Sequence, residues 1–235
     1  MGRIFEKRKH KMFARWSKMA KGFTKMGKEI AIAVKAGGPH PESNPRLRMV
    51  MQNAKAINMP KDRIEAAIKR ASEKSSANFE EIVYEGYGPH GVAILVECAT
   101  DNTTRTVANI RMYYTRSGGT LGTSGSLSFI FERKCIFRIS AEGRNIEELE
   151  LELIDFGMDE IEQDENELVI YTPFTEFGTM QKALEERGIT VISAEKQRIP
   201  TSFKELTEEQ EAEVNELIEQ IEEDDDVQAV YTNVK

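Results

Sequence analysis

The lysines and arginines of the first third of the chain are the residues whose type and spacing most clearly suggest a chemical task. Through Ser76 the chain carries 19 basic and 6 acidic residues, a net charge of +13. From Ala77 onward it carries 13 basic and 34 acidic residues, a net charge of −21, so the overall −8 hides this division. Lysine and arginine neutralise phosphates and release counterions, which gives affinity for a polyanion without reading its sequence. The asymmetry therefore predicts a polyanion-binding module on an acidic carrier.

Helical spacing organises this basic segment. Apolar residues recur at alternating intervals of four and three, which places on one helical stripe Met12, Trp16, Met19, Phe23, Met26 and Ile30. Gly22 and Gly27 weaken this helix and could divide it in two. Asn44 before Pro45 is a favourable start for a second helix through about residue 57, and Pro60 begins a third in the same way.

Three glycine- or threonine-rich stretches invite a phosphate-binding interpretation. Residues 86–91 (GYGPHG) match G-x-G-x-x-G, but a strand follows where a helix is required, so a hairpin turn is favoured. Residues 117–126 lack the G-K-[ST] ending of a phosphate loop and indicate a flexible connection with glycines at positive φ. At 100–106 Arg105 could receive a phosphate, but helix capping by Asp101 or Asn102 is favoured.

Catalytic and metal-binding patterns are absent from the sequence. The three histidines lack ligand spacing, and no cysteine or histidine has a readable nucleophile–base arrangement. The acidic run at 222–226 could hold a divalent cation, but a solvated bend is favoured. Cys98 and Cys135 are expected to be buried, reduced thiols. We therefore predict a protein that is not an enzyme and has no catalytic residue, metal, cofactor or small-molecule substrate.

The sequence also predicts a cytoplasmic protein with no membrane partner. The longest apolar runs resemble the five residues at 92–96, far short of the roughly 20 that span a bilayer. The first 30 residues lack the apolar core of a secretory signal.

The acidic body has the periodicity of strands and short helices. Strands are expected at 80–85, 92–99 and 126–133, with a helix at 103–116. Residues 134–198 then give a complete βαββαβ unit of the ferredoxin-like type. The remaining capped helix from Thr207 and a last strand at about 227–233 require a sheet to join. The expected fold is α+β in three domains: a basic helical domain at 1–77, a discontinuous α/β domain at 78–133 plus 199–235, and an inserted ferredoxin-like domain at 134–198.

Four long stretches, 27–48, 58–71, 84–106 and 117–134, closely resemble the YebC/PmpR family, which includes the mitochondrial translational activator of cytochrome c oxidase. This resemblance covers nearly the whole chain and implies a helical N-terminal domain followed by two α/β domains. It also implies a probable transcriptional regulator that binds DNA. Some members resemble translation factors that act at the ribosome to relieve stalling, notably at proline runs.

The resemblance and the charge pattern together predict which residues bind nucleic acid. The resemblance implies phosphate contacts at Lys25, Lys28, Lys35, Arg46, Arg48, Lys55, Lys61 and Arg63. The basic character of the first helix adds Arg8, Lys11, Arg15, Lys18 and Lys21. The family commonly begins with a G-H-S-K-W-type segment, whereas this chain begins MGRIFEKRKHKMFARW. The expected function is a DNA-binding transcriptional regulator. The alternatives are a ribosome-associated translation factor that binds ribosomal RNA, and a scaffold whose basic helices pair with an acidic protein.

Overall fold

The computed structural model describes residues 21–73 and 77–235. Its first helix covers residues 21–37 of the described part, followed by α2 (Pro45–Ala56) and α3 (Lys61–Ser72). The division that Gly22 and Gly27 could have caused does not occur within residues 21–37, where the helix is continuous and Phe23 packs against a core that contains Ile30. Asn44 begins α2 as expected: its Oδ1 accepts from the Leu47 N–H at 3.0 Å.

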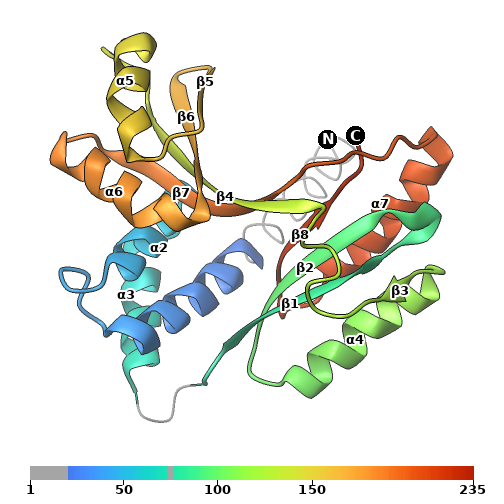
Figure 1. Cartoon of the computed structure of the whole chain (residues 1–235). Helices are drawn as coiled ribbons and strands as arrows, with labels where there is room; N and C mark the ends of the chain where they lie inside the picture. The colour runs from blue at the N-terminus through green and yellow to red at the C-terminus, as the bar shows by residue number, and fades with distance from the viewer. Residues whose placement is uncertain (1–20, 74–76) are drawn as a thin grey trace, which may run out of the picture.

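The first sheet is antiparallel throughout, with the strand order β3-β1-β2-β8. Its strands are β1 (Glu80–Tyr87), β2 (Ala93–Thr100), β3 (Thr120–Leu121) and β8 (Val227–Thr232). Helices α4 (Thr103–Arg116) and α7 (Glu208–Glu222) cover one face, where Ile94 of β2 shares a core with Ile110 and Leu217 (Figure 1). Residues 88–92 connect β1 to β2 as a hairpin and contain the short helix η1 (Pro89–Gly91), while Gly86 and Tyr87 are the last paired residues of β1. The hairpin prediction is confirmed.

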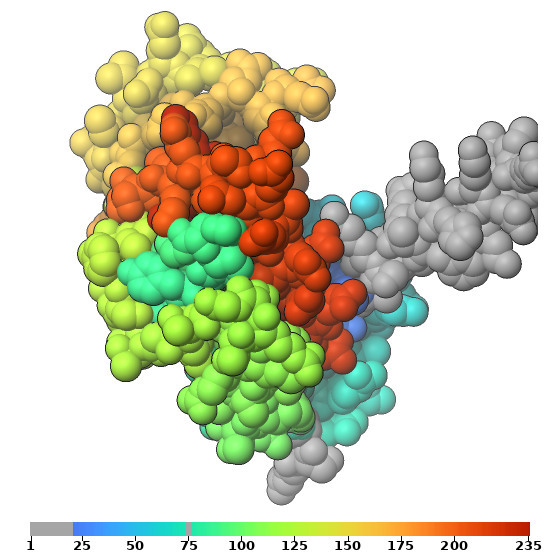
Figure 2. Space-filling model, turned by 90° about the vertical axis from the view of Figure 1, so that its right-hand side faces the viewer, coloured from blue at the N-terminus to red at the C-terminus, as the bar shows by residue number. Residues whose placement is uncertain are grey.

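Figure 2 shows the side of the molecule on which the red C-terminal residues lie against the green residues of the first sheet and α4. Thr207 and Gln210 form the expected capping box at the start of α7. None of the helices formed by residues 21–73 and 77–235 is long and apolar enough to cross a membrane.

The second sheet has the strand order β5-β6-β4-β7, which is the antiparallel order of a ferredoxin-like unit. Along the chain it consists of β4 (Phe131–Ser140), α5 (Ile146–Leu153), η2 (Ile154–Phe156), β5 (Glu160–Asp164), β6 (Glu167–Pro173), η3 (Phe174–Glu176), α6 (Phe177–Glu186) and β7 (Val191–Pro200). The predicted α+β class, with a helical region before two α/β units, is confirmed.

One expected strand is wrong. Residues 124–130 form turns instead of a strand, and β4 begins at Phe131. The carboxylate of Glu85 holds these turns, since it accepts the backbone N–H groups of Gly125 at 2.9 Å and Leu127 at 2.7 Å. The expected domain boundary between residues 133 and 134 consequently falls inside β4, whose first residues pair with the end of β7.

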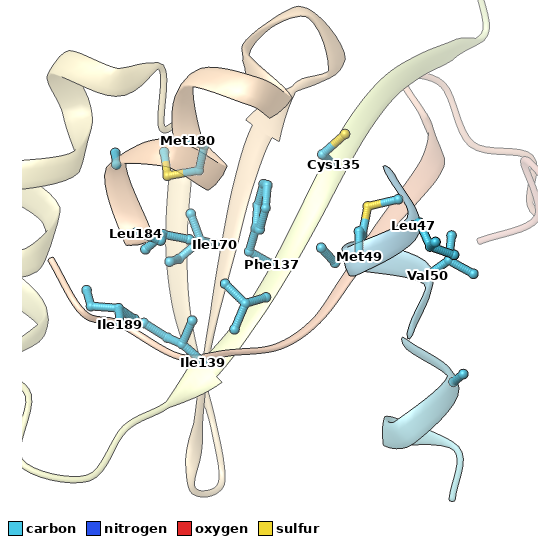
Figure 3. Close-up of a cluster of buried hydrophobic side chains, with 14 of the residues drawn as sticks. Leu47, Met49, Val50, Cys135, Phe137, Ile139, Ile170, Met180, Leu184 and Ile189 are labelled. Atoms are coloured by element: carbon cyan, nitrogen blue, oxygen red, sulfur yellow. The ribbon is translucent and has the colours of Figure 1, made fainter. Parts of the chain in front are cut away.

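The helical domain and the second sheet share one hydrophobic core, shown in Figure 3. Met49 and Val50 of α2 belong to the same buried cluster as Phe137 of β4. Asn53 of α2 binds the backbone of the edge strand β7: its Nδ2 donates to the Ala194 carbonyl at 2.8 Å, and its Oδ1 accepts the Ala194 N–H at 2.9 Å. These two bonds satisfy backbone groups that an edge strand otherwise leaves unpaired.

Both cysteines are buried and free, as expected. Cys135 lies in the shared core, and Cys98 lies in the core of the first sheet. Burial raises the pKa of Cys135 to about 11 and that of Cys98 to about 12, so both thiols stay protonated at neutral pH.

Replacing Asn53 with alanine tests the contact between α2 and β7. Asn53→Ala leaves the Ala194 N–H and C=O buried without partners, so we expect it to lower the free energy of unfolding by about 2–4 kcal/mol. Urea titration at pH 7 measures this change. Gln52→Ala on the same helix is the control, and equal stabilities for the two variants would show that the Asn53 contact contributes nothing.

Candidate nucleic-acid interface

Two of the predicted phosphate-binding lysines face the interior of the molecule. Lys28 Nζ forms an ion pair with Asp226 Oδ1 at 2.9 Å and donates to the carbonyl oxygens of Ala99 and Asp225 at 3.0 and 2.7 Å. Its side chain is only 12% exposed. Lys25 Nζ donates to the Gln228 carbonyl at 3.0 Å. The basic side of the first helix therefore attaches this helix to the first sheet.

Asp226 is the acceptor at the centre of this attachment. Its Oδ2 accepts from Arg105 at 2.7 Å and from the hydroxyls of Thr100 and Thr106 at 3.1 and 2.9 Å. Burial alone would raise the pKa of Asp226, but hydrogen bonds from Lys28, Arg105 and Thr106 outweigh it and lower the pKa to about 2. The acidic run at 222–226 is thus not simply a solvated bend, because its last carboxylate is buried in an ion-pair cluster.

Residues 100–106 cap the start of α4, and the phosphate-binding interpretation of this stretch is not supported. Asn102 Oδ1 accepts the Arg105 N–H at 3.0 Å and caps α4, as favoured from the sequence. The Arg105 guanidinium contacts Asp226 and Asp101, both within 3.0 Å, so its charge is already neutralised. Within residues 21–73 and 77–235 there is no cluster of three or more His, Cys, Asp or Glu side chains that could hold a metal ion.

Arg46 and Arg48 connect α2 to both α/β units. Arg46 Nη2 lies 2.6 Å from Glu81 Oε1 at the start of β1. Arg48 Nη1 donates to the Pro41 carbonyl at 2.9 Å, and its Nη2 lies 3.7 Å from Glu185 of α6. Both side chains are about one-third exposed, which leaves part of each guanidinium open to solvent.

Four other predicted cations of the described helices are open to solvent. Lys55 is exposed on α2, and Lys35 is exposed near the end of the first helix. Lys61 is 87% exposed and pairs with Glu65, one turn later, at 3.5 Å. Arg63 is also exposed on α3. Lys21 is half-buried, whereas Arg8, Lys11, Arg15 and Lys18 lie outside the described residues.

Sequence reasoning missed two further cations, Lys69 and Arg70, in the last turn of α3. Both are exposed. Their position at the C-terminal end of an expected helix was the available signal, because cations are favoured there by the helix dipole. Among residues 21–73 of the helical domain, six cations are therefore exposed: Lys35, Lys55, Lys61, Arg63, Lys69 and Arg70.

A cavity of about 400 Å³ with a mixed charged and apolar lining, which we call the junction cavity, lies where the helical domain meets both sheets. Burial raises the pKa of Glu29, which lines it, to about 6, although the charges of Lys196 and Arg46 oppose that shift. The side-chain amide of Gln228 is buried there with no hydrogen-bond partner among the described residues. Charged residues of both signs line the cavity in equal number, namely Glu29, Glu81, Glu97 and Glu195 with Arg46, Arg133, Lys196 and Arg198.

Comparison with known proteins covers almost the whole chain. The model of the TACO1/YebC second and third domain matches residues 79–234, and that of the TACO1/YebC N-terminal domain matches residues 3–74. A protein of Cytophaga hutchinsonii is 60% identical over 100% of this chain and 98% of its own. One of Flavobacterium psychrophilum is 58% identical over 98% of each chain. Both are named probable transcriptional regulatory proteins. The crystal structure of a conserved hypothetical protein from Aquifex aeolicus has a TM-score of 0.76 and 39% identity, over 92% of this chain and 90% of the other.

Asp226→Asn tests the attachment of the first helix. The substitution leaves Lys28 buried without a counter-charge, so we expect the free energy of unfolding to fall by about 3–5 kcal/mol at pH 7. The folded state lowers the pKa of Asp226 from 3.8 to about 2, so this contribution is complete above pH 4 and disappears as the pH falls towards 2. Urea titrations across this pH range measure it. Asp225→Asn, on the exposed neighbour, is the control, and an equal loss in both variants contradicts the assignment.

Glu29→Gln tests the buried carboxyl in the junction cavity. The folded state raises the pKa of Glu29 from 4.5 to about 6, so ionisation of Glu29 destabilises the fold fully above pH 6 and not at all below about 4.5. We expect the variant to be more stable than the wild type by roughly 2 kcal/mol at pH 7.5 and equally stable at pH 4. Thermal unfolding at both pH values measures the difference. A gain at pH 7.5 no larger than that of exposed Glu42→Gln would contradict this expectation.

Proposed function

The chain belongs to the TACO1/YebC family, and on that premise we propose that it is a regulatory protein that binds nucleic acid through the exposed cations of its helical domain. The observation that carries the proposal is the division of the basic residues into two groups. Lys25 and Lys28 are bonded within the molecule, whereas six cations on the first helix, α2 and α3 are exposed. Exposed lysines and arginines supply the phosphate contacts that dominate affinity for nucleic acid.

The negative charge of the acidic body determines from which side a polyanion can approach the protein. The residues from Ala77 onward carry a net charge of −21, and the first turn of α7 alone presents Glu208, Glu209 and Glu211. A polyanion is repelled from such a surface and attracted to the helical domain. We therefore propose that nucleic acid approaches from the side of α2 and α3.

We propose control of transcription through DNA as the first assignment, because relatives at 58–60% identity carry the name probable transcriptional regulatory protein. The second candidate is a translation factor that binds ribosomal RNA at the ribosome and relieves stalling. The exposed cations favour both ligands equally, because phosphate contacts position a ligand but do not identify its bases. A scaffold that pairs its cations with an acidic protein is the third candidate.

Binding without catalysis is part of the proposal. The two thiols have raised pKa values and are protonated at neutral pH, which removes the nucleophilic thiolate. His90 Nε2 lies 2.8 Å from Glu213 at the surface, with no nucleophile among the described residues bonded to its ring. We further propose that the protein acts in the cytoplasm.

Charge reversal on α2 and α3 tests nucleic-acid binding. We expect the triple variant Lys55→Glu, Lys61→Glu and Lys69→Glu to lose at least about tenfold in affinity for both a 20-base-pair DNA duplex and an RNA hairpin. Each lost phosphate contact should also lower the slope of log K against log salt by about 0.7–0.9. Fluorescence anisotropy at several salt concentrations measures both quantities.

The control makes the same change in net charge outside the helical domain, at exposed Arg111, Arg116 and Arg144, each replaced by glutamate. Equal salt slopes for the two triple variants would contradict the proposed surface. Ribosome profiling of a deletion strain separates the first two candidates: pauses at proline runs favour translation, whereas altered promoter activity without pauses favours transcription.

A further inference from the structure

A groove of about 570 Å³ opens in the helical domain between the first helix, α3 and the residues that lead into β1. Phe23 lines it from the first helix and Phe79 from the opposite end, next to β1. The wall contributed by α3 consists of Ala66, Ala67 and Ala71, whose small side chains leave the space between the helices open. The groove is therefore mainly apolar and lies within the most basic part of the described chain.

Cations face both aromatic rings of this groove. The guanidinium carbon of Arg63 lies 5.8 Å from the centroid of the Phe23 ring, and Lys28 Nζ lies 5.3 Å from the centroid of the Phe79 ring. Arg70 completes the basic lining and is exposed on α3. Lys28 Nζ is already bonded to Asp226. The cations of the lining that remain available to a ligand are therefore Arg63 and Arg70.

The charge of the lining differs from that of the junction cavity. Among the described residues, Lys28, Arg63 and Arg70 are the charged residues of the groove lining and no carboxylate lines it, whereas the junction cavity carries equal numbers of both signs. The groove is therefore complementary to a ligand that combines negative charge with flat or apolar groups.

We propose that this groove binds unpaired nucleotides, with bases against Phe23 and Phe79 and phosphates at Arg63 and Arg70. Single strands bind proteins through aromatic side chains that stack on bases and a basic groove that follows the backbone, which is the combination present here. Bases inside a duplex are stacked on one another and cannot enter. The proposal rests on the proposed function and specifies its ligand: nucleic acid with an exposed loop, bulge or single-stranded end.

An acidic amphipathic helix of a protein is the competing occupant. It offers carboxylates to the arginines and apolar side chains to the groove. Single-stranded nucleic acid is favoured because its aromatic and anionic groups alternate at every nucleotide, while the groove places Arg63 beside the Phe23 ring and adds Phe79 and Arg70 to the same lining. Nucleic-acid bases stack on aromatic rings, whereas the aliphatic side chains of a protein helix do not need an aromatic surface to pack against.

Leucine substitutions test the aromatic faces while retaining apolar volume. With the full chain, we expect Phe79→Leu and Phe23→Leu each to weaken binding of a labelled 12-nucleotide oligo-U by at least about fivefold, the low end of the stacking range. Affinity for a 20-base-pair DNA duplex should stay within twofold of wild type. Phe203→Leu, at a phenylalanine that is 60% exposed elsewhere, is the control and should change neither affinity. Thermal unfolding confirms that each variant is folded.

A measurement without substitutions covers the case in which a leucine variant does not fold. Oligo-U containing 5-iodouridine, irradiated with the wild-type protein, should crosslink to peptides that contain Phe23 or Phe79. Crosslinks confined to other peptides overturn the proposal, as does oligo-U binding that neither leucine variant weakens. The proposal is also overturned if an acidic amphipathic peptide displaces oligo-U and both leucine variants abolish binding of that peptide.

These outcomes are distinguishable from failure of the proposed function. If the charge-reversal triple loses all binding while the leucine variants bind oligo-U like the wild type, nucleic acid binds the exposed cations and the groove is not used. If the charge-reversal triple retains both duplex and single-strand binding, the proposed function itself is wrong.

Discussion

The ion pair between Lys28 and Asp226 is the contact on which the arrangement of the helical domain depends. These residues are separated by 198 positions in the sequence, yet the lysine ammonium and the carboxylate lie 2.9 Å apart and are almost completely buried. Arg105 of α4 shares the same carboxylate, so one acidic side chain joins the first helix, α4 and the start of β8. A buried charge that loses its partner is strongly unfavourable, which makes this orientation of the first helix specific.

The helical domain is attached to the two sheets by contacts of different kinds. Against the second sheet it shares a hydrophobic core, reinforced by the two hydrogen bonds between Asn53 and the backbone of β7. Against the first sheet it makes ion pairs and lysine–carbonyl hydrogen bonds, and the junction cavity, lined by Glu29 and Gln228 among others, lies between the two. Apolar burial does not depend on the protonation of a side chain, whereas the buried Lys28–Asp226 pair is lost when Asp226 takes up a proton. The two sheets are therefore held to the helices by contacts that respond differently to pH.

This division accounts for the two kinds of basic residue in the helical domain. Cations of the first helix that face the first sheet donate hydrogen bonds to groups of the same chain: Lys25 to a carbonyl oxygen and Lys28 to a carboxylate. Cations on the outer surfaces of α2 and α3, such as Lys55 and Lys69, have no such group opposite them among the described residues and remain exposed. The net charge of the helical domain therefore overstates the number of residues available to a polyanion, because some of its basic side chains already bind groups of the same chain.

The sequence by itself determined the features that depend on near neighbours along the chain. Hydrophobic periodicity predicted α4 and the βαββαβ unit, and capping residues predicted the starts of α2 and α7, because these patterns act within one or two turns. Only the tertiary structure decided that residues 124–130 form turns, since the carboxylate that holds them belongs to Glu85, about 40 residues earlier. Likewise, helical spacing assigns Lys28 to one side of its helix but does not say what faces that side. The acceptor is Asp226, and only folding brings it there.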